Sequence, residues 1–407
     1  MNAPTHQGQR TAHLDTAGTG RMPAAVQSVL ADCTARDDRF GPHALEEELG
    51  AVLHTGIHER LGALLGVPAG RTALAVGAAD AFHAYVSRLD LGPRDRIWTT
   101  PHEGVARLTT LHALRERTRC RLEVVPLRAD GDLDLEWMLE HIDEDVALVS
   151  VVHVSAVCGT VNPVEAVGRL LAPHRALYAV DASHAVGQLP VDAARIGCDL
   201  LTADGWRFLR GPQGIGFAYA GPRSAEAFPE PPAPAAVAAL YTALGHHAAA
   251  MSLPHPQLLP RLRSTVARAP GIDLLAAGRV QAGIVGFRHG EVPAALVRRA
   301  LARRGIVVRK SVAQEHPLHP AGREAPTALV ASVHYDNTAE DIDHLGPALR
   351  EALHEIVREE RKFAAVSAVR VLAAAGAAPV GRPPVRQDPY RRPEPFRRGH
   401  LTLHTTS

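Results

Sequence analysis

The chain has 407 residues, of which 46% are hydrophobic and 21% are charged, a balance typical of a folded globular protein rather than a disordered one. Its 44 basic and 43 acidic residues leave a formal net charge of +1, which argues against nucleic acid or an anionic membrane surface as a partner. The four cysteines form no CxxC or CxxH pair, and no stretch approaches about 18 apolar residues, so we expect a cytoplasmic protein without a metal site, a disulfide framework or a membrane span.

From about Asp15 to Ala220, short apolar runs bounded by turn residues alternate with stretches of helical periodicity. This alternation predicts strand–helix units that build a mostly parallel sheet. The run at 147–154 is apolar on both faces, which indicates a central strand covered on both sides. The predicted strands are Arg96–Thr99, Leu122–Pro126, Ala147–Val152, Leu177–Val180, Leu200–Ala203 and Ile215–Tyr219.

The second half of the chain predicts a smaller αβ unit after a proline-dense stretch at 229–234. Its last helix begins at Thr338 with Asp341 three residues on, the pattern of a capping box, and apolar residues then recur at three- and four-residue spacing. The other expected elements are helices at 235–251, 258–269 and 292–304 and strands at 283–288, 306–309 and 328–334.

These patterns predict a division of the chain into five parts. Residues 1–12 are expected to be flexible, 13–228 to form the large domain, 229–262 a proline-rich linker and interdomain helix, 263–362 the small C-terminal domain, and 363–407 a disordered tail rich in proline and arginine.

Lysine is scarce in this sequence. Only Lys310 and Lys362 occur, so residues 1–309 contain no side chain with a primary amine. Any chemistry that requires an amine nucleophile in the large domain is therefore excluded on composition alone.

Several motifs together resemble the class V aminotransferase and cysteine desulfurase family. They are LDTAG at 14–18, HVSAVCGT at 153–160, VDASHAVGQLPVD at 180–192, GPQGIG at 211–216 and SVHYDNT at 332–338. The resemblance covers roughly residues 13–358 and is strongest toward the branch of the ergothioneine-pathway carbon–sulfur lyase (hercynylcysteine sulfoxide lyase) and isopenicillin N epimerase.

The resemblance implies an α/β fold of the aspartate-aminotransferase type, fold type I of the enzymes that use pyridoxal 5′-phosphate (PLP). It has a mostly parallel central sheet with helices on both faces and a small C-terminal α/β domain. The family's aspartate that pairs with the pyridinium nitrogen matches Asp181, where a carboxylate keeps the ring protonated as an electron sink. His184 matches the residue that faces the cofactor's phenolic oxygen.

Other family positions have changed in this sequence. The Schiff-base lysine, four residues before the Gly-Pro of the GPQGIG loop, is Arg207, and a guanidinium cannot form the imine. The hydroxyl residues of the phosphate loop match Ala78 and Ala79, and the serine that also reaches the phosphate matches Asp204, which would repel a dianion. PLP binding is therefore expected to be weak or absent.

The positions for the ring and the substrate differ as well. The stacking residue matches Gly104, the asparagine after His-Val-Ser matches Ala156, and the arginine that clamps an amino-acid carboxylate matches Val330. An isopropyl group cannot replace a bidentate guanidinium contact. No residue is therefore assigned a catalytic role with assurance, and amino-acid substrates are not expected to be held in the family's way.

Three functional hypotheses follow. The chain is a degenerate homologue, a non-catalytic or regulatory subunit that forms a homodimer or pairs with an active paralogue. Alternatively it is a carbon–sulfur lyase or aminotransferase that holds PLP non-covalently. In a third hypothesis it is a repurposed enzyme that binds another anionic small molecule through Arg207, His102, Asp181 and His184. Against the third, Arg207 could simply pair with Asp181 or Asp204 and fill the space of the cofactor.

Overall fold

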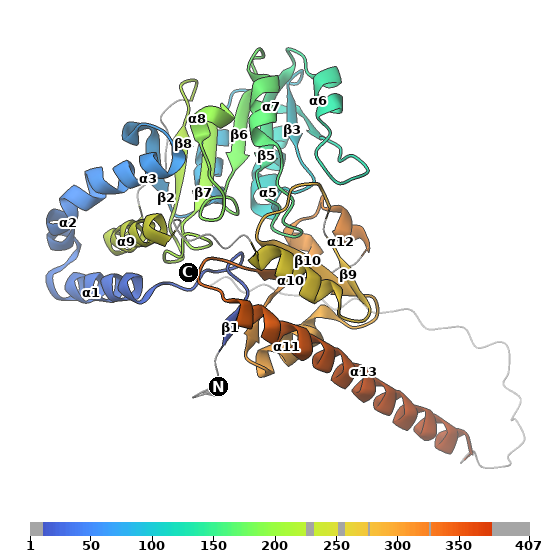
Figure 1. The fold of residues 1–407 in the computed structure, drawn as a ribbon. Helices are drawn as coiled ribbons and strands as arrows, with labels where there is room; N and C mark the ends of the chain where they lie inside the picture. Colours follow the sequence, from blue (N-terminus) through green and yellow to red (C-terminus); the bar gives the residue numbers. More distant parts are fainter. Residues whose placement is uncertain (1–10, 225–231, 251–256, 276, 325–326, 377–407) are drawn as a thin grey trace, which may run out of the picture. The chain divides into compact units, whose positions relative to one another are not determined.

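The computed structural model describes residues 11–224, 232–250, 257–275, 277–324 and 327–376 (Figure 1). The chain forms two compact units, residues 1–357 and 358–407, and all the sheets lie in the first. The predicted flexible start, the predicted boundary at 228–229 and the tail beyond 376 fall wholly or almost wholly outside the described residues. None of the helices in the described part is both long enough and apolar enough to cross a membrane.

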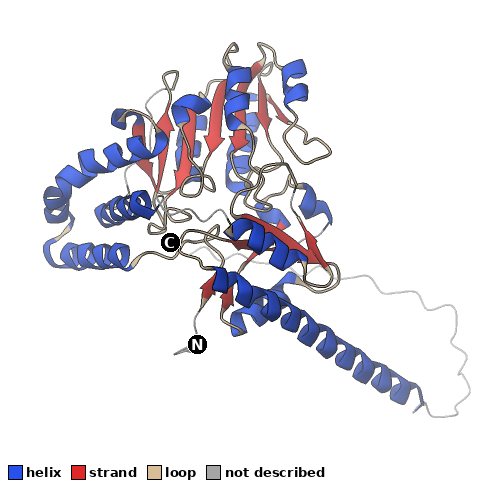
Figure 2. Cartoon of the chain, in the orientation of Figure 1, coloured by secondary structure: helices blue, strands red, loops and turns tan. Residues whose placement is uncertain are grey.

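A seven-stranded sheet forms the larger layer, with helices on both of its faces (Figures 1 and 2). Only the two pairs that involve β8 are antiparallel, so the predicted, mostly parallel sheet is confirmed. The order across the sheet is β2 (Thr72–Ala75), β8 (Gly216–Ala220), β7 (Leu200–Asp204), β6 (Leu177–Asp181), β5 (Val146–Val152), β3 (Arg96–Thr99) and β4 (Arg121–Val124).

Two hydrophobic cores cover the two faces of this sheet. Successive residues of a strand point to opposite faces, so Leu200 packs in one cluster and Leu201 in the other. Every residue of β5 is buried, as the apolar run at 147–154 predicted. This burial on both faces explains why the central strands show no alternation of polar and apolar residues.

Most helices begin directly after a glycine, a proline or a capping aspartate, which are ordinary signals for the start of a helix. They are α1 (Ala24–Phe40), α2 (Pro42–Ala51), α3 (Ile57–Leu65), α4 (Ala78–Val86), α5 (Val105–Thr118), α6 (Leu135–His141), α7 (Val164–Leu171), α8 (Ala193–Ile196), α9 (Pro234–Ala250), α10 (Leu258–Ala267), α11 (Ala294–Arg303), α12 (Pro320–Glu324) and α13 (Ala339–Gly376). Short π- or 3₁₀-helical turns occur at η1 (Val52–Gly56), η2 (Ala69–Arg71) and η3 (Ala313–Glu315).

A second, four-stranded antiparallel sheet lies in the C-terminal half. Its order is β12 (Arg309–Val312), β13 (Thr327–Ser332), β10 (Ile284–His289) and β9 (Ile272–Leu274). A separate parallel pair joins β1 (Ala12–His13) to β11 (Ile306–Val307). Ala12 and Leu14 are buried in the core of this C-terminal half, so the start of the chain packs with the small domain rather than with the large one to which residues from 13 onward were predicted to belong.

The predicted tail at 363–407 requires a correction over its first part. Helix α13 continues to Gly376 instead of ending near 362. Alanine has the highest intrinsic helix propensity, and residues 364–378 are rich in it, which explains the extension.

Candidate functional site

A cavity of about 340 Å³ opens at the carboxyl ends of the parallel strands, where ligands bind in open α/β sheets. The loops after β2, β3, β5, β6 and β7 supply one wall, and the segment from β12 to η3 supplies another. The predicted site residues that line it are Ala78, Ala79, His102, Gly104, Ala156, Asp181, His184, Asp204 and Arg207. Eight of the nine predicted site positions and His102 therefore meet at one place.

Arg207 and Asp204 form an ion pair in this cavity, with 2.8 Å between Arg207 Nε and Asp204 Oδ2. The other carboxylate oxygen of Asp204 accepts a hydrogen bond from the Ala78 amide, 3.0 Å away, at the N-terminus of α4. Burial raises the pKa of Asp204, an effect that the Arg207 charge and the Ala78 amide oppose. The side chain of residue 204 thus takes the place of an anion at the helix N-terminus.

Arg207 also holds the start of the chain against the cavity. Its Nη1 donates to the carbonyl of Ala17 at 2.7 Å, and the carbonyl of Gly18 lies 3.3 Å away. Of the two carboxylates that Arg207 was expected to pair with, the ion pair is with Asp204, and the cavity beside it stays open. Arg210 lies outside the cavity lining and pairs with Asp336 at 3.1 Å.

Asp181, at the end of β6, faces a buried polar network that the sequence did not reveal. Its Oδ1 accepts from the Ser183 amide at 2.9 Å, and its Oδ2 lies 4.0 Å from Arg107 Nε. Arg107 is paired with Glu103 at 2.9 Å, and both side chains are almost fully buried. A buried ion pair of this kind is retained only when its hydrogen bonds are satisfied. Here Thr99, Ser150 and Thr202 complete them.

His184 contacts the backbone rather than Asp181. Its Nε2 lies 3.2 Å from the carbonyl of Ala17. Burial and the nearby Arg207 and Arg309 charges hold the pKa of His184 well below its ordinary value. The ring is therefore neutral near pH 7, and it is poorly placed to act with Asp181 as an acid–base pair.

Arg309, on β12, is a second cationic group in the cavity and was missing from the sequence interpretation. It stands in register with Val330 of β13, the position that matches the family's substrate arginine. Val330 is fully buried in the core and does not line the cavity, whereas Arg309 does and donates to the carbonyl of Ala156 at 2.9 Å. Its Nε has no hydrogen-bond partner. Burial and the neighbouring Arg207 lower the pKa of Arg309.

The two lysines lie elsewhere. Lys310 is on β12, in register with Leu329, and is not among the residues that line the cavity. Lys362 lies in α13, beyond the residues whose side chains the structure describes. The described lining of the cavity therefore contains no amine nucleophile.

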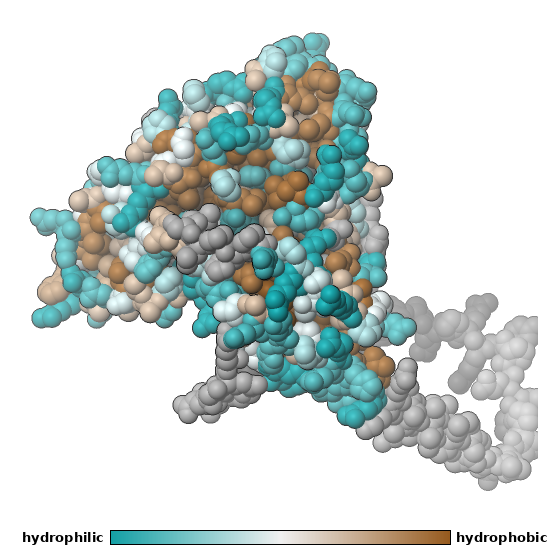
Figure 3. Space-filling model, in the orientation of Figure 1, coloured by the Kyte–Doolittle hydropathy of each residue, from teal (hydrophilic) through white to brown (hydrophobic). Residues whose placement is uncertain are grey.

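A second cavity, of about 470 Å³, is lined mainly by apolar residues of α3, α9 and the loop at 186–191. The space-filling view shows hydrophobic surface gathered where α3, α9 and the sheet lie in Figure 1 (Figure 3). The apolar residues that line this second cavity are Ala63, Leu64, Val186, Leu189, Pro190, Val191 and Leu244, together with Ala248.

Sequence comparison matches residues 12–235 to the family described as aminotransferase class V. A probable cysteine desulfurase from Halobacterium salinarum is 31% identical over 219 residues, which are 52% of this chain and 52% of that protein. A probable cysteine desulfurase from Streptomyces coelicolor is 30% identical over 228 residues, 53% of this chain and 54% of that protein. The chain thus spans about half the length of the curated relatives it matches.

The fold is also found in solved structures. The cysteine desulfurase CsdA from Escherichia coli matches with a TM-score of 0.71 and 21% identity, over 84% of this chain and 95% of that one. The cystine C–S lyase C-DES, solved with its reaction product cysteine persulfide, matches with a TM-score of 0.72 and 18% identity, over 84% of this chain and 97% of that one. At these identities the likeness establishes the fold, which is that of the cysteine desulfurases and confirms the predicted fold type I architecture.

Proposed function

Because this chain belongs to the class V aminotransferase family, we propose that it is a homologue without aldimine chemistry that acts as a non-catalytic or regulatory subunit. Within the family we assign its ancestry to enzymes of carbon–sulfur chemistry. The motif resemblance to the carbon–sulfur lyase branch and the cysteine desulfurase relatives both support that assignment.

The observation that carries the proposal is the contact from Arg207 through Asp204 to the Ala78 amide. In the family a lysine binds the aldehyde of PLP, and the N-terminus of a helix binds its phosphate. Here Arg207 stands at the position of the lysine, and the Asp204 carboxylate already accepts from the Ala78 amide at the N-terminus of α4. The residues present therefore do not fit PLP, and no step of a reaction is assigned to it here.

The test is to incubate the purified full-length chain with PLP, reduce it with borohydride and map the peptides. We expect no pyridoxyl group on any lysine and no visible absorbance band that survives dialysis. A pyridoxyl group on Lys310 or Lys362 at one equivalent per chain would contradict the proposal. A band that survives dialysis without such a group would instead favour the enzyme that holds PLP non-covalently.

A second candidate function is the binding of a small anion, which the presence of Arg309 beside Arg207 favours. Two guanidinium groups line one cavity, and Arg309 Nε lacks a partner. Thermal unfolding in inorganic phosphate, sulfate and a dicarboxylate would test it, with Arg309→Met as the variant. Stabilisation that the Arg309→Met variant loses supports an anion site, and equal response of both proteins counts against it.

We also propose that the subunit associates either with itself or with an active paralogue in the cytoplasm. The hydrophobic cavity beside α3 and α9 supports association, and the four free cysteines support a reducing compartment. Native mass spectrometry of the purified chain, alone and mixed with a PLP-bound paralogue, distinguishes the two assemblies. A monomer under both conditions would exclude them.

A further inference from the structure

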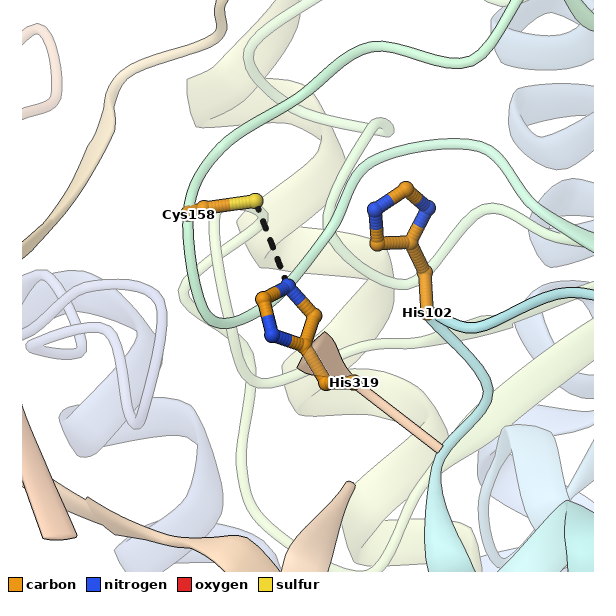
Figure 4. A group of neighbouring side chains, drawn as sticks. All are labelled: His102, Cys158 and His319. Atoms are coloured by element: carbon orange, nitrogen blue, oxygen red, sulfur yellow. Dashed lines mark hydrogen bonds between the residues drawn. The ribbon is translucent and has the colours of Figure 1, made fainter. Parts of the chain in front are cut away.

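Three buried side chains from separate segments meet beside the main cavity, the one of about 340 Å³ (Figure 4). They are His102 in the loop after β3, Cys158 in the loop after β5, and His319 before α12, and we call them the Cys158 cluster. Their exposed fractions are 2%, 0% and 6%, and one nitrogen or sulfur atom of each lies within 4.8 Å of the other two. Each histidine turns one ring nitrogen toward the sulfur, so the position of the ring protons decides the chemistry of this cluster.

Neighbouring groups fix the tautomer of both histidines. His319 Nδ1 accepts a hydrogen bond from the Ala321 amide at 3.2 Å, so the ring proton is on Nε2. His102 Nδ1 lies 3.0 Å from Asn162 Nδ2, and the same Nδ2 donates to the Val152 carbonyl. Because a carbonyl can only accept, the orientation of this side-chain amide is fixed and His102 Nδ1 is an acceptor. Both Nε2 atoms therefore carry a proton, which they present to the shared sulfur.

Two hydroxyl groups also contact the sulfur. Thr160 Oγ1 lies 3.1 Å from Cys158 Sγ, but it donates its own proton to a backbone carbonyl and can only accept from the thiol. Ser155 Oγ, at 3.2 Å, accepts from the thiol and can turn its proton toward the sulfur once the thiol has ionised. The ionised sulfur would then receive hydrogen bonds from Ser155, from His102 and from His319 Nε2, which lies 3.6 Å away.

Two of the buried cysteines have opposite surroundings. Burial raises the pKa of the Cys198 thiol, and the Asp199 charge raises it further. Burial also acts to raise the pKa of the Cys158 thiol, but hydrogen bonds from His102 and His319 outweigh it and hold that pKa well below its ordinary value. Cys158 is therefore a thiolate near neutral pH, whereas Cys198 stays a thiol.

The space around the Cys158 cluster limits what can reach it. His102 lines the main cavity, and His319 lines a separate cavity of about 20 Å³ together with Val157, the residue before Cys158. A cavity of that volume holds about one water molecule. The sulfur has no exposed surface, so a peptide thiol or disulfide is too large to reach it in the folded chain. Hydrogen peroxide is close to water in size.

We propose that Cys158 is a site of oxidation by small hydroperoxides, with His102 and His319 as the N–H donors to its sulfur. The thiolate attacks one peroxide oxygen, the O–O bond breaks, and the departing hydroxide takes up a proton and leaves as water. The sulfur loses two electrons and the peroxide gains them, so the product is a sulfenic acid. This site shares no residue with the Arg207–Asp204 pair.

The first experiment compares the four cysteines within one sample of the full-length chain. All four are buried, so Cys33, Cys120 and Cys198 are internal controls for burial. The chain is treated with H₂O₂ at pH 6, quenched with catalase and unfolded in dimedone, which labels sulfenic acid, before peptide mapping. An ordinary thiol is only about 0.3% ionised at pH 6, and the thiolate is the reactive form, so Cys158 should be labelled at least ~100-fold faster than Cys198. Oxidised glutathione in place of H₂O₂ should leave Cys158 unmodified.

The pH dependence tests the role of the histidines. The rate at Cys158 should be the same at pH 8 and pH 6, whereas the rate for an ordinary thiol falls roughly 80-fold over that range. His319→Leu removes one N–H donor and should make the rate fall with pH, while His319→Gln, which retains an N–H donor, should preserve most of the flat profile. The matched control is His247→Gln, which removes a buried histidine outside the cluster and should leave the profile unchanged.

Four results would overturn the proposal. They are labelling of Cys158 no faster than that of Cys198, a rate at Cys158 that falls with pH as that of an ordinary thiol does, a mixed disulfide of Cys158 with glutathione in the folded chain, and a flat pH profile that His319→Leu leaves unaltered while its circular dichroism matches that of the unaltered chain. The first three are measured on the unaltered chain, so they do not depend on whether a variant folds.

Discussion

Replacing Asp204 by serine should open the α4 N-terminus to an anion, and the effect is best seen in a chain that also carries Arg207→Lys. The first change removes the carboxylate that now accepts from the Ala78 amide, and the second supplies an amine at the family's lysine position. Arg207→Lys alone should restore little, because Asp204 would still occupy the helix N-terminus.

The magnitude follows from the contact distances. Asp204 Oδ1 now lies 3.0 Å from the Ala78 amide nitrogen. A phosphate oxygen that accepted from the same amide would stand beside the Asp204 carboxylate, with the two anions roughly 4 Å apart. At an effective dielectric constant of about 20, two unit charges at that separation repel by about 4 kcal/mol. That energy corresponds to about three orders of magnitude in Kd. We therefore expect the double variant to bind PLP at least ~100-fold more tightly than Arg207→Lys alone.

The assay is a spectrophotometric titration with PLP, followed by borohydride reduction and peptide mapping. Asp204→Ser with Arg207 retained is the control, because it relieves the repulsion without supplying an amine and should bind PLP without forming an aldimine. If Arg207→Lys alone forms a reducible aldimine as tightly as the double variant does, the reasoning about Asp204 is wrong.

Three other variants test the structure. Burial, with a smaller effect of the His334 charge, lowers the pKa of His247 to about 4. In the unfolded chain His247 takes up a proton near pH 6.5, whereas in the folded chain it does so only near pH 4. The free energy of unfolding therefore decreases as the pH falls from about 6.5 to 4. His247→Gln should make this fall shallower by up to ~3 kcal/mol in urea unfolding at pH 4, and an unchanged slope would contradict it. Glu103→Gln, which removes the nearer of the two carboxylates beside the buried Arg107, should lower the free energy of unfolding by about 3 kcal/mol, and a loss below 1 kcal/mol, the size expected of an exposed pair, would show the ion pair to be unimportant. Gly159→Ala should cost at least ~1 kcal/mol, because Gly159 has a φ of 78° and an added Cβ would lie 2.2 Å from the carbonyl oxygen of Ile284; thermal unfolding at an unaltered Tm would refute that account.

The sequence by itself determined the family and most of the large sheet. Strands at 96–99 and 200–203 were located to within a residue, because buried strands are continuous apolar runs bounded by turn residues. The lack of lysine in residues 1–309 excluded an internal aldimine there without any knowledge of the fold. The Arg207–Asp204 pair was also predictable, since its members are three residues apart on one loop.

Only the tertiary structure decided which distant residues meet. Arg309 enters the cavity because β12 pairs with β13, a register that no local pattern specifies. The parallel pair of β1 and β11 joins segments nearly 300 residues apart. Parallel strands cannot be joined by a short turn, so neither two-residue sequence indicates its partner. Cys158 and His319 are 161 residues apart in the sequence, yet Cys158 Sγ lies 3.6 Å from His319 Nε2. Contacts of this range depend on how whole elements pack, whereas a sequence pattern reports only the neighbours along the chain.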